Sequence, residues 1–270
     1  METLEVHTLI CKRDVTWWID TVKLFKHHSG LNFLTVVHDD GSLDDAACET
    51  LRGAIAPIKI WKRNDADAAV APLLVNYPHC FHFRFSSNHT IFRIKLFDPF
   101  LLSESGNVIQ MDADILFCKT PTALINCINR GVGFYFRDMA SSYCVPFRDE
   151  DNDKIINRFI NAGMTYFPSK GHYSLDAVEK CLEIMYKHGS RGATHPFLEQ
   201  TCIAFLITKL IERNIQFVQL PHPDYCVPTF NQFVPEHGCV ALHLNSSPLV
   251  GRFKTEHYQH ELAKTQAPVK

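Results

Sequence analysis

The sequence predicts an α/β fold in which helices flank a mostly parallel β-sheet. Apolar, β-branched runs alternate with segments of helical spacing from the first residues onward, as expected when helices connect parallel strands. The chain has 270 residues and is 46% hydrophobic, which is enough apolar surface for one large core. A buried strand also ends abruptly in two carboxylates, and open α/β sheets bind ligands at the carboxyl ends of their strands.

The first part of the chain predicts a β-α-β-α-β unit. The run NFLTVVH is apolar and β-branched, which is typical of a buried parallel strand. Ser42 follows a turn, and we expect it to cap a helix that carries acidic residues in its first turn. The expected strands are residues 6–11, 32–38 and 56–61, and the expected helices are residues 15–28 and 43–51.

The rest of the chain predicts further alternation, with no internal repeat and no linker that would divide it. We expect residues 64–89 to be a polar, less regular region and residues 137–153 to form a surface loop. Apolar spacing predicts amphipathic helices at 175–187 and 197–213. The other expected helices are 90–102 and 121–129, and the other expected strands are 108–111, 131–136 and 215–220. The apolar run resumes at 115–117, and residues 159–167 mix apolar residues with a central Asn-Ala-Gly. We therefore expect a single domain.

Charge and cysteine content argue against several classes of protein. The 27 basic and 29 acidic residues nearly cancel, which removes the electrostatic basis for a nucleic-acid or membrane-surface binder. No apolar stretch is long enough to span a membrane, and the first residues do not resemble a secretory signal. The ten cysteines stand singly, without a Cys-x-x-Cys pair. Together these features predict reduced cysteines and a cytoplasmic protein.

The strongest local signal is the segment VIQMDADILF. Asp112 and Asp114 stand one residue apart after a buried strand, where two carboxylates are costly unless something compensates them. Alternate residues of an extended segment point the same way, so both carboxylates can converge on one hard cation. Mn²⁺ or Mg²⁺ would leave coordination positions open for phosphate oxygens. The alternative is a surface turn whose aspartates cap the following segment.

Five segments, in order along the chain, resemble metal-dependent glycosyltransferases of the GT-A fold, nearest to the glycogenin and bacterial galactosyltransferase-like branch. They are LTVVHDDGSLDDAACETL, FRIKLFDPFLL before VIQMDADILF, FINAGMTYF, FLEQTCIAF and ALHLNSSP. The resemblance implies one Rossmann-like GT-A domain over residues 1–270. Residues 1–117 would form its nucleotide-sugar and metal-binding half, and residues 118–270 its acceptor-side half.

The resemblance also implies a role for each matching residue. Asp112 and Asp114 of the DXD motif would bind the metal with His243 as a third ligand, a mixture that favours Mn²⁺ slightly over Mg²⁺. The catalytic positions would be Glu199 and Gln200, beside the sugar and the reacting centre. The donor-binding residues would be Lys95, Arg93, Asp112, Asn161, Gly163, Arg252 and Lys254.

One segment departs from the family pattern. The familiar branch follows its late His with Gly and a Lys-Pro-Trp stretch that holds the diphosphate, whereas LNSSP follows His243. The nearest basic residues are Arg252 and Lys254, and either would supply positive charge to the leaving diphosphate. The departure leaves the closeness of the family assignment and the choice between retaining and inverting chemistry open.

The implied function is a hexosyltransferase that moves a sugar from a nucleoside diphosphate sugar to an acceptor hydroxyl. A UDP-sugar is slightly favoured as the donor, and a glycan or another hydroxyl compound is the expected acceptor. Two alternatives stay open. A haloacid-dehalogenase-like phosphatase also uses Asp-x-Asp at a strand end, and a catalytically silent scaffold would bind a nucleotide sugar without turning it over.

Overall fold

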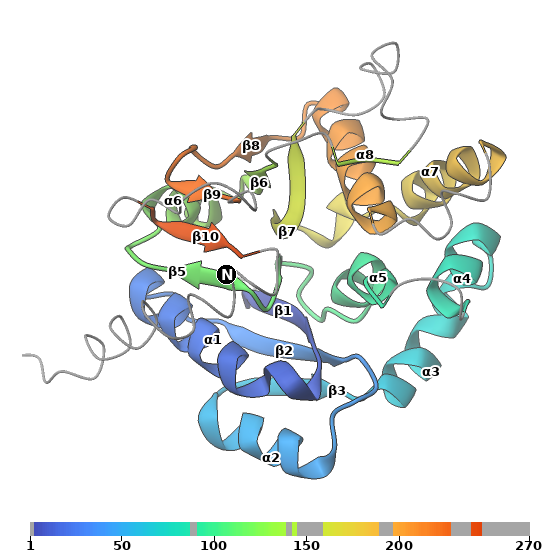
Figure 1. Ribbon diagram of the computed structural model, residues 1–270. Coiled ribbons are helices and arrows are strands. Elements are labelled where there is room, and N and C mark those ends of the chain that lie inside the picture. The colour runs from blue at the N-terminus through green and yellow to red at the C-terminus, as the bar shows by residue number, and fades with distance from the viewer. Residues whose placement is uncertain are drawn as a thin grey trace, which may run out of the picture.

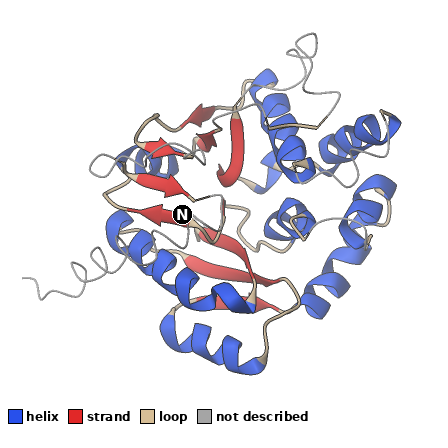
Figure 2. Ribbon diagram, in the orientation of Figure 1, coloured by secondary structure: helices blue, strands red, loops and turns tan. Residues whose placement is uncertain are grey.

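The computed structural model describes residues 3–86, 91–138, 142–144, 159–188, 197–227 and 239–244. Within these ranges the chain forms two β-sheets with helices packed around them (Figure 1; Figure 2). The helices are α1 (Val15–Ser29), α2 (Asp45–Ala54), α3 (Arg63–Leu74), α4 (Pro78–Phe85), α5 (Arg93–Leu101), α6 (Thr122–Arg130), α7 (Leu175–Lys187) and α8 (Leu198–Glu212).

The larger sheet is mostly parallel, which confirms the predicted α/β fold class. Its strands are β1 (Glu5–Ile10), β2 (Leu34–Asp39), β3 (Ile58–Trp61), β4 (Val108–Met111), β6 (Gly133–Arg137), β7 (Ile160–Phe167) and β8 (Phe217–Gln219), in the order β3-β2-β1-β4-β7-β6-β8. Among these described strands, β7 is antiparallel to its neighbours β4 and β6, and every other pair is parallel. The smaller sheet contains β5 (Ile115–Phe117), β10 (Ala241–His243) and β9 (Tyr225–Cys226), in that order.

Helices cover both faces of the larger sheet, so its central strands are buried on both sides. Helices α3, α4, α5, α7 and α8 share one apolar core with β4, β6 and β7, and they lie on the right of Figure 1. Helices α1, α2 and α6 share a second core with the opposite face of the sheet and with the smaller sheet. Because β1, β2 and β4 run parallel, their carboxyl ends meet at one edge of the sheet.

The predicted β-α-β-α-β unit is confirmed as β1, α1, β2, α2 and β3. The predicted cap of α2 is wrong by two residues. The Asp44 side chain accepts the hydrogen bond from the Ala47 N–H, whereas the Ser42 hydroxyl accepts one from the Lys12 N–H. The turn is longer than expected because the Asp39 carboxylate holds the backbone N–H of Leu43 in place.

The expectation of a less regular region over residues 64–89 is wrong for its described part. Helix α3 runs to Leu74 and contains Pro72, and α4 begins at Pro78, where the missing N–H of proline costs nothing. These prolines and the short break between the helices interrupt the apolar periodicity by which a long helix is recognised.

Helix α8 is buried almost all round, not amphipathic as predicted. Strand β7 and helices α5 and α7 pack around it, and even the polar residues Glu199, Gln200 and Thr201 of its first turn are buried. Apolar residues on all sides are what a helix inside a core requires. A buried acid in that setting needs a partner.

All ten cysteines are free, and most are buried. A buried cysteine without a disulfide packs as a small apolar residue. The described helices include none with the length and apolar character needed to cross a membrane.

Candidate active site

Two backbone pairings bring the candidate metal ligands together. Asp112 follows β4 directly, and its N–H donates to the Gly163 carbonyl of β7 at 2.7 Å. Strand β10 pairs antiparallel with β5, so that His243 stands opposite Ile115. The pairing continues beyond the strand, because the Leu244 N–H donates to the Asp114 carbonyl at 2.9 Å. His243 therefore lies beside Asp114 although the two are far apart in the sequence.

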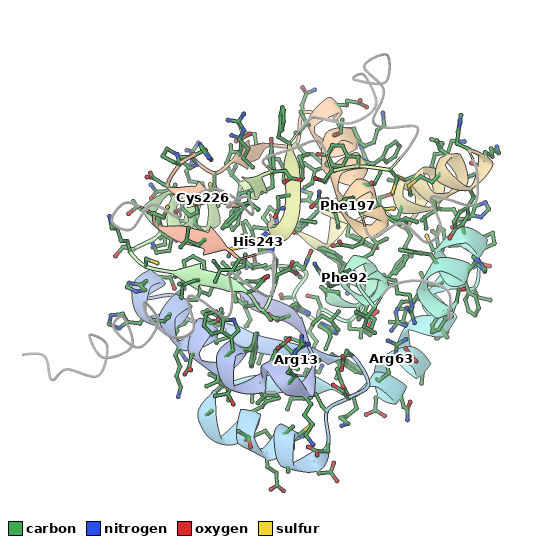
Figure 3. All side chains as sticks on the ribbon, in the orientation of Figure 1. Arg13, Arg63, Phe92, Phe197, Cys226 and His243 are labelled. Carbon is green, nitrogen blue, oxygen red and sulfur yellow. The ribbon has the colours of Figure 1, made fainter. Side chains whose placement is uncertain are left out.

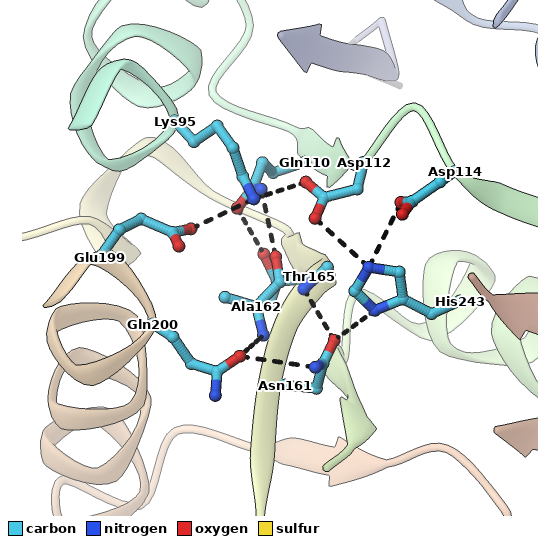
Figure 4. A network of polar contacts seen from close by, with 11 residues as sticks. Lys95, Gln110, Asp112, Asp114, Asn161, Ala162, Thr165, Glu199, Gln200 and His243 are labelled. Atoms are coloured by element: carbon cyan, nitrogen blue, oxygen red, sulfur yellow. Dashed lines mark hydrogen bonds and ion pairs between the residues drawn. The ribbon is translucent and has the colours of Figure 1, made fainter. Parts of the chain in front are cut away.

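The three side chains form a compact group of hard and borderline ligands. The Nε2 atom of His243 lies 3.5 Å from Asp112 Oδ2 and 3.3 Å from Asp114 Oδ1 (Figure 4). One ligand atom from each of the three residues lies within 4.8 Å of the others. His243 is buried, whereas the two carboxylates are partly exposed and can be approached from solvent. Two carboxylate oxygens and an imidazole nitrogen are a donor set that could hold a metal ion.

The protonation of this group follows from its neighbours. Burial alone would lower the pKa of His243, but the Asp114 and Asp112 carboxylates raise it to about 10. Burial alone would raise the pKa of Asp112, but Lys95 and His243 hold it below its ordinary value. The two carboxylates therefore favour the protonated imidazolium, and a cation bound at Nε2 would displace its proton.

Lys95 of α5 and Glu199 of α8 complete the charge network. Lys95 Nζ lies 2.6 Å from Asp112 Oδ1 and 3.6 Å from Glu199 Oε1 (Figure 4). Burial lowers the pKa of Lys95, but Asp112 and Glu199 outweigh it and hold the ammonium charged. Burial raises the pKa of Glu199 to about 7, because Lys95 offsets only part of the cost of burying the carboxylate. Such a carboxyl can exchange a proton near neutral pH.

Strand β7 passes between α8 and His243 and contacts both. Asn161 Oδ1 accepts a hydrogen bond from His243 Nδ1 at 2.9 Å, and the Gln200 side chain contacts the backbone of the same strand. A methyl group added at Gly163 would overlap the His243 imidazole, so this position requires glycine for steric reasons. Asn161 and Gly163 are thus packed against one of the candidate metal ligands, and Gln200 contacts Asn161 from the α8 side of the strand.

Most of the predicted site residues that the structure describes lie together, and one of the described ones does not join them. The gathered residues are Lys95, Asp112, Asp114, Asn161, Gly163, Glu199, Gln200 and His243. Arg93 is directed toward α4 instead, where its Nε donates to the Arg84 carbonyl at 3.0 Å. Arg252 and Lys254 lie outside the described residues.

Two exposed aromatic residues lie next to the buried charges. Phe92 is 45% exposed and Phe197 is 37% exposed, and they precede Lys95 and Glu199 at the starts of α5 and α8 (Figure 3). The Lys95 ammonium is 5.3 Å from the centre of the Phe92 ring. Exposed aromatic faces beside a polar site are suited to contact with a bound ligand.

Sequence reasoning missed Asp138, which it assigned to a surface loop. Asp138 follows β6 and is buried, and its carboxylate accepts a hydrogen bond from Gln200 Nε2 at 2.8 Å. The sequence contained a signal for it, because an acid directly after the buried strand GFYFR has the same pattern as Asp112 after VIQM.

Comparison with known proteins identifies the fold. No protein-family model matches the sequence, and a search of curated proteins finds no relative. Mouse xyloside xylosyltransferase 1 is similar in structure, with a TM-score of 0.57 and 13% identity over 91% of this chain and 98% of that one. The galactosyltransferase LgtC, solved with donor and acceptor sugar analogues, gives a TM-score of 0.54 and 12% identity over 96% of this chain and 100% of that one.

A third similar structure is the bifunctional glycosyltransferase WbbM, with a TM-score of 0.54 and 10% identity over 98% of this chain and 52% of that one. At such identities the similarity establishes architecture. The chain therefore has the GT-A fold, as the resemblance of its sequence motifs implied.

Proposed function

We propose that this protein is a metal-dependent glycosyltransferase, which moves a sugar from a nucleoside diphosphate sugar to an acceptor hydroxyl. The observation that carries the proposal is the convergence of Asp112, Asp114 and His243 at the carboxyl end of β4 in a GT-A fold. Ligands of open α/β sheets bind at this edge. The proposed donor is a UDP-sugar, the proposed class is hexosyltransferase, and the proposed acceptor is a glycan or another hydroxyl compound.

The proposed site supplies charge where the reaction develops it. A divalent ion, Mn²⁺ or Mg²⁺, would supply positive charge against the departing diphosphate. Lys95 keeps Asp112 ionised and fixed in position, since their contact is only 2.6 Å long. Asn161 and Gly163 would line the donor sugar, and Arg252 and Lys254 would face the diphosphate.

Glu199 is the proposed proton acceptor or sugar-facing carboxylate. It is buried and has a pKa near 7. In an inverting reaction it would deprotonate the acceptor hydroxyl. In a retaining reaction it would lie against the sugar, with Gln200 close to the anomeric carbon. Phe92 and Phe197 would contact a sugar ring of the acceptor.

The phosphatase alternative is not favoured. A phosphatase of that class needs its first aspartate free to act as a nucleophile, whereas Asp112 is held by Lys95 and lies against His243. The fold is also that of glycosyltransferases. The catalytically silent scaffold would share the same fold and ligands, so turnover separates it from the proposed enzyme.

Ligand-induced stabilisation tests the donor class. The melting temperature is measured with nucleoside diphosphates and their sugars, with Mn²⁺ or with a chelator. Uridine nucleotides with Mn²⁺ are expected to raise it by about 5 °C or more at saturating concentration. Stabilisation by nucleotides that is equal in the chelator would contradict the metal-dependent site.

Asp114→Ala should abolish the Mn²⁺-dependent stabilisation, because it removes one of the three candidate metal ligands. The matched control is Glu212→Ala, an exposed acid at the opposite end of α8 from Glu199. Its surface ion pair with Lys209 contributes little, so the control should respond to ligands as the unaltered protein does.

A further inference from the structure

A continuous line of hydrogen bonds leads from the candidate metal site to the end of β6. His243 Nδ1 contacts Asn161 Oδ1 at 2.9 Å, and Asn161 Nδ2 donates to Gln200 Oε1 at 3.4 Å (Figure 4). Gln200 Nε2 then donates to Asp138 Oδ2 at 2.8 Å. All four side chains are at most 8% exposed, so water does not compete strongly for these bonds.

Backbone groups support the same orientation of each amide that the Asp138 carboxylate requires. Backbone N–H groups only donate, and carbonyl oxygens only accept. The Gly163 N–H donates to Asn161 Oδ1 at 2.9 Å, and the Ala162 N–H donates to Gln200 Oε1 at 3.3 Å. On the other side, Gln200 Nε2 donates to the Ser142 carbonyl at 3.1 Å. Rotating either amide by a half turn would place donor against donor or acceptor against acceptor.

The direction of the line determines where the histidine carries its proton. The Asp138 carboxylate can only accept, so it draws the Gln200 NH₂ group toward itself and leaves Gln200 Oε1 facing Asn161. Asn161 must then present its oxygen to His243, and Nδ1 must donate to it. Nε2 is thereby the nitrogen that faces Asp112 and Asp114, and its lone pair becomes available to a cation there once the imidazolium proton has left. A histidine ligates a metal through the nitrogen opposite the one that donates.

We propose that Asp138, acting through Gln200 and Asn161, is a positioning residue that holds His243 in the tautomer whose Nε2 can bind a divalent cation. The inference rests on the proposed metal site and adds to it a residue that does not touch the cation. It also gives Asn161 and Gln200 a role in orienting His243, apart from any contact with the donor sugar.

The test measures Mn²⁺ affinity of the full chain by electron paramagnetic resonance of the unbound ion. Asp138→Asn should weaken binding roughly 10-fold, because an amide at this position no longer dictates the orientation of Gln200. Asn161→Ala should weaken it roughly 10- to 100-fold. Glu212→Gln is the control, and its Mn²⁺ affinity should be unchanged. The melting temperature in chelator establishes that each variant is folded.

A conservative variant separates positioning from a general structural role. In Asn161→Asp, the carboxylate accepts from His243 Nδ1 and Gly163 N without help from the rest of the line. It should bind Mn²⁺ at least 10-fold more tightly than Asn161→Ala. Adding Asp138→Asn to Asn161→Asp should then have no further effect, because Asp138 no longer determines the tautomer. If Asp138→Asn does not fold, Gln200→Met breaks the same line at constant volume and should give the same loss.

Three outcomes would overturn the inference. The first is that Asp138→Asn, or Gln200→Met if the former does not fold, leaves Mn²⁺ affinity unchanged. The second is that Asp138→Asn lowers Mn²⁺ affinity by the same factor in the unaltered protein and in the Asn161→Asp variant. Either result would leave the proposed metal site intact. Absence of Mn²⁺ binding by the unaltered protein would instead overturn both the metal site and its positioning residue.

Discussion

At the residue scale, each charged group of the site is held by a neighbour of opposite charge. Asp112 lies between Lys95 and His243, and Lys95 is shared with Glu199. Buried charges are tolerated only when they are paired in this way. Loss of one member would leave the others buried without compensation, so single substitutions here should affect stability as well as ligand binding.

Gly163→Ala tests the close packing of β7 against His243. The added methyl group would overlap the imidazole and displace it, so Mn²⁺ affinity should fall at least 10-fold. Overpacking should also cost about 1–3 kcal/mol of unfolding free energy, measured by denaturant titration. In Gly53→Ala, by contrast, no atom lies near the new methyl group, and this control should bind Mn²⁺ normally. Normal Mn²⁺ binding by Gly163→Ala would refute the packing argument.

His38, another buried histidine, should make the stability of the protein depend on pH. Glu5 accepts from His7 Nε2 at 2.7 Å, and His38 Nε2 therefore donates to His7 Nδ1 at 2.9 Å. Burial, with His7, Arg84 and Lys59 nearby, holds the pKa of His38 well below 6.5. Below pH 6.5, His38 is therefore protonated in the unfolded chain but stays neutral in the folded chain. The free energy of unfolding falls as the pH decreases from there.

His38→Gln removes this titration and keeps a donor for His7. Between pH 6.5 and 5, the slope of unfolding free energy against pH should be smaller in the variant than in the unaltered protein, by up to about 1.4 kcal/mol per pH unit. Denaturant titrations at several pH values measure the slope. An unchanged slope would show that His38 does not titrate as described.

At the element scale, sequence patterns predicted the strands and helices that carry the site, but not how they meet. VIQM was predicted as a strand from its apolar run, and β4 has the same bounds. The pairing of β10 with β5 could not be predicted, because three-residue strands carry little periodic signal. Only the family resemblance indicated that His243 would reach the two aspartates.

Helices α4 and α5 are joined by a buried ion pair that gives a further test. Arg84 donates to Asp98 through Nε at 2.7 Å and through Nη2 at 2.8 Å, and neither side chain is appreciably exposed. Asp98→Ala leaves the guanidinium buried without its main partner and should cost about 3–5 kcal/mol in denaturant titration. Glu183→Ala breaks only exposed pairs with Lys180 and Lys187 and should change stability little. Equal effects of the two substitutions would contradict this account.

At the scale of the whole molecule, positive and negative charges nearly cancel, but several of them are concentrated at the candidate site. The chain has a formal net charge of -2, yet its candidate site gathers three carboxylates, an ammonium and an imidazole around the end of one strand. The sequence predicted Asp112 and Asp114 because paired acids after an apolar strand are costly. It missed Asp138, because a single acid after a strand is common and its partner Gln200 comes from a distant helix.

The central claim is that this fold and site transfer sugar from a nucleotide donor with a divalent cation. The most direct measurement is the release of nucleoside diphosphate from a panel of nucleotide sugars, with Mn²⁺ or with chelator, by the unaltered protein and by Asp114→Ala. We predict release from at least one donor, a UDP-sugar first, only with Mn²⁺ and only by the unaltered protein. Release that persists both in chelator and in Asp114→Ala would contradict the claim.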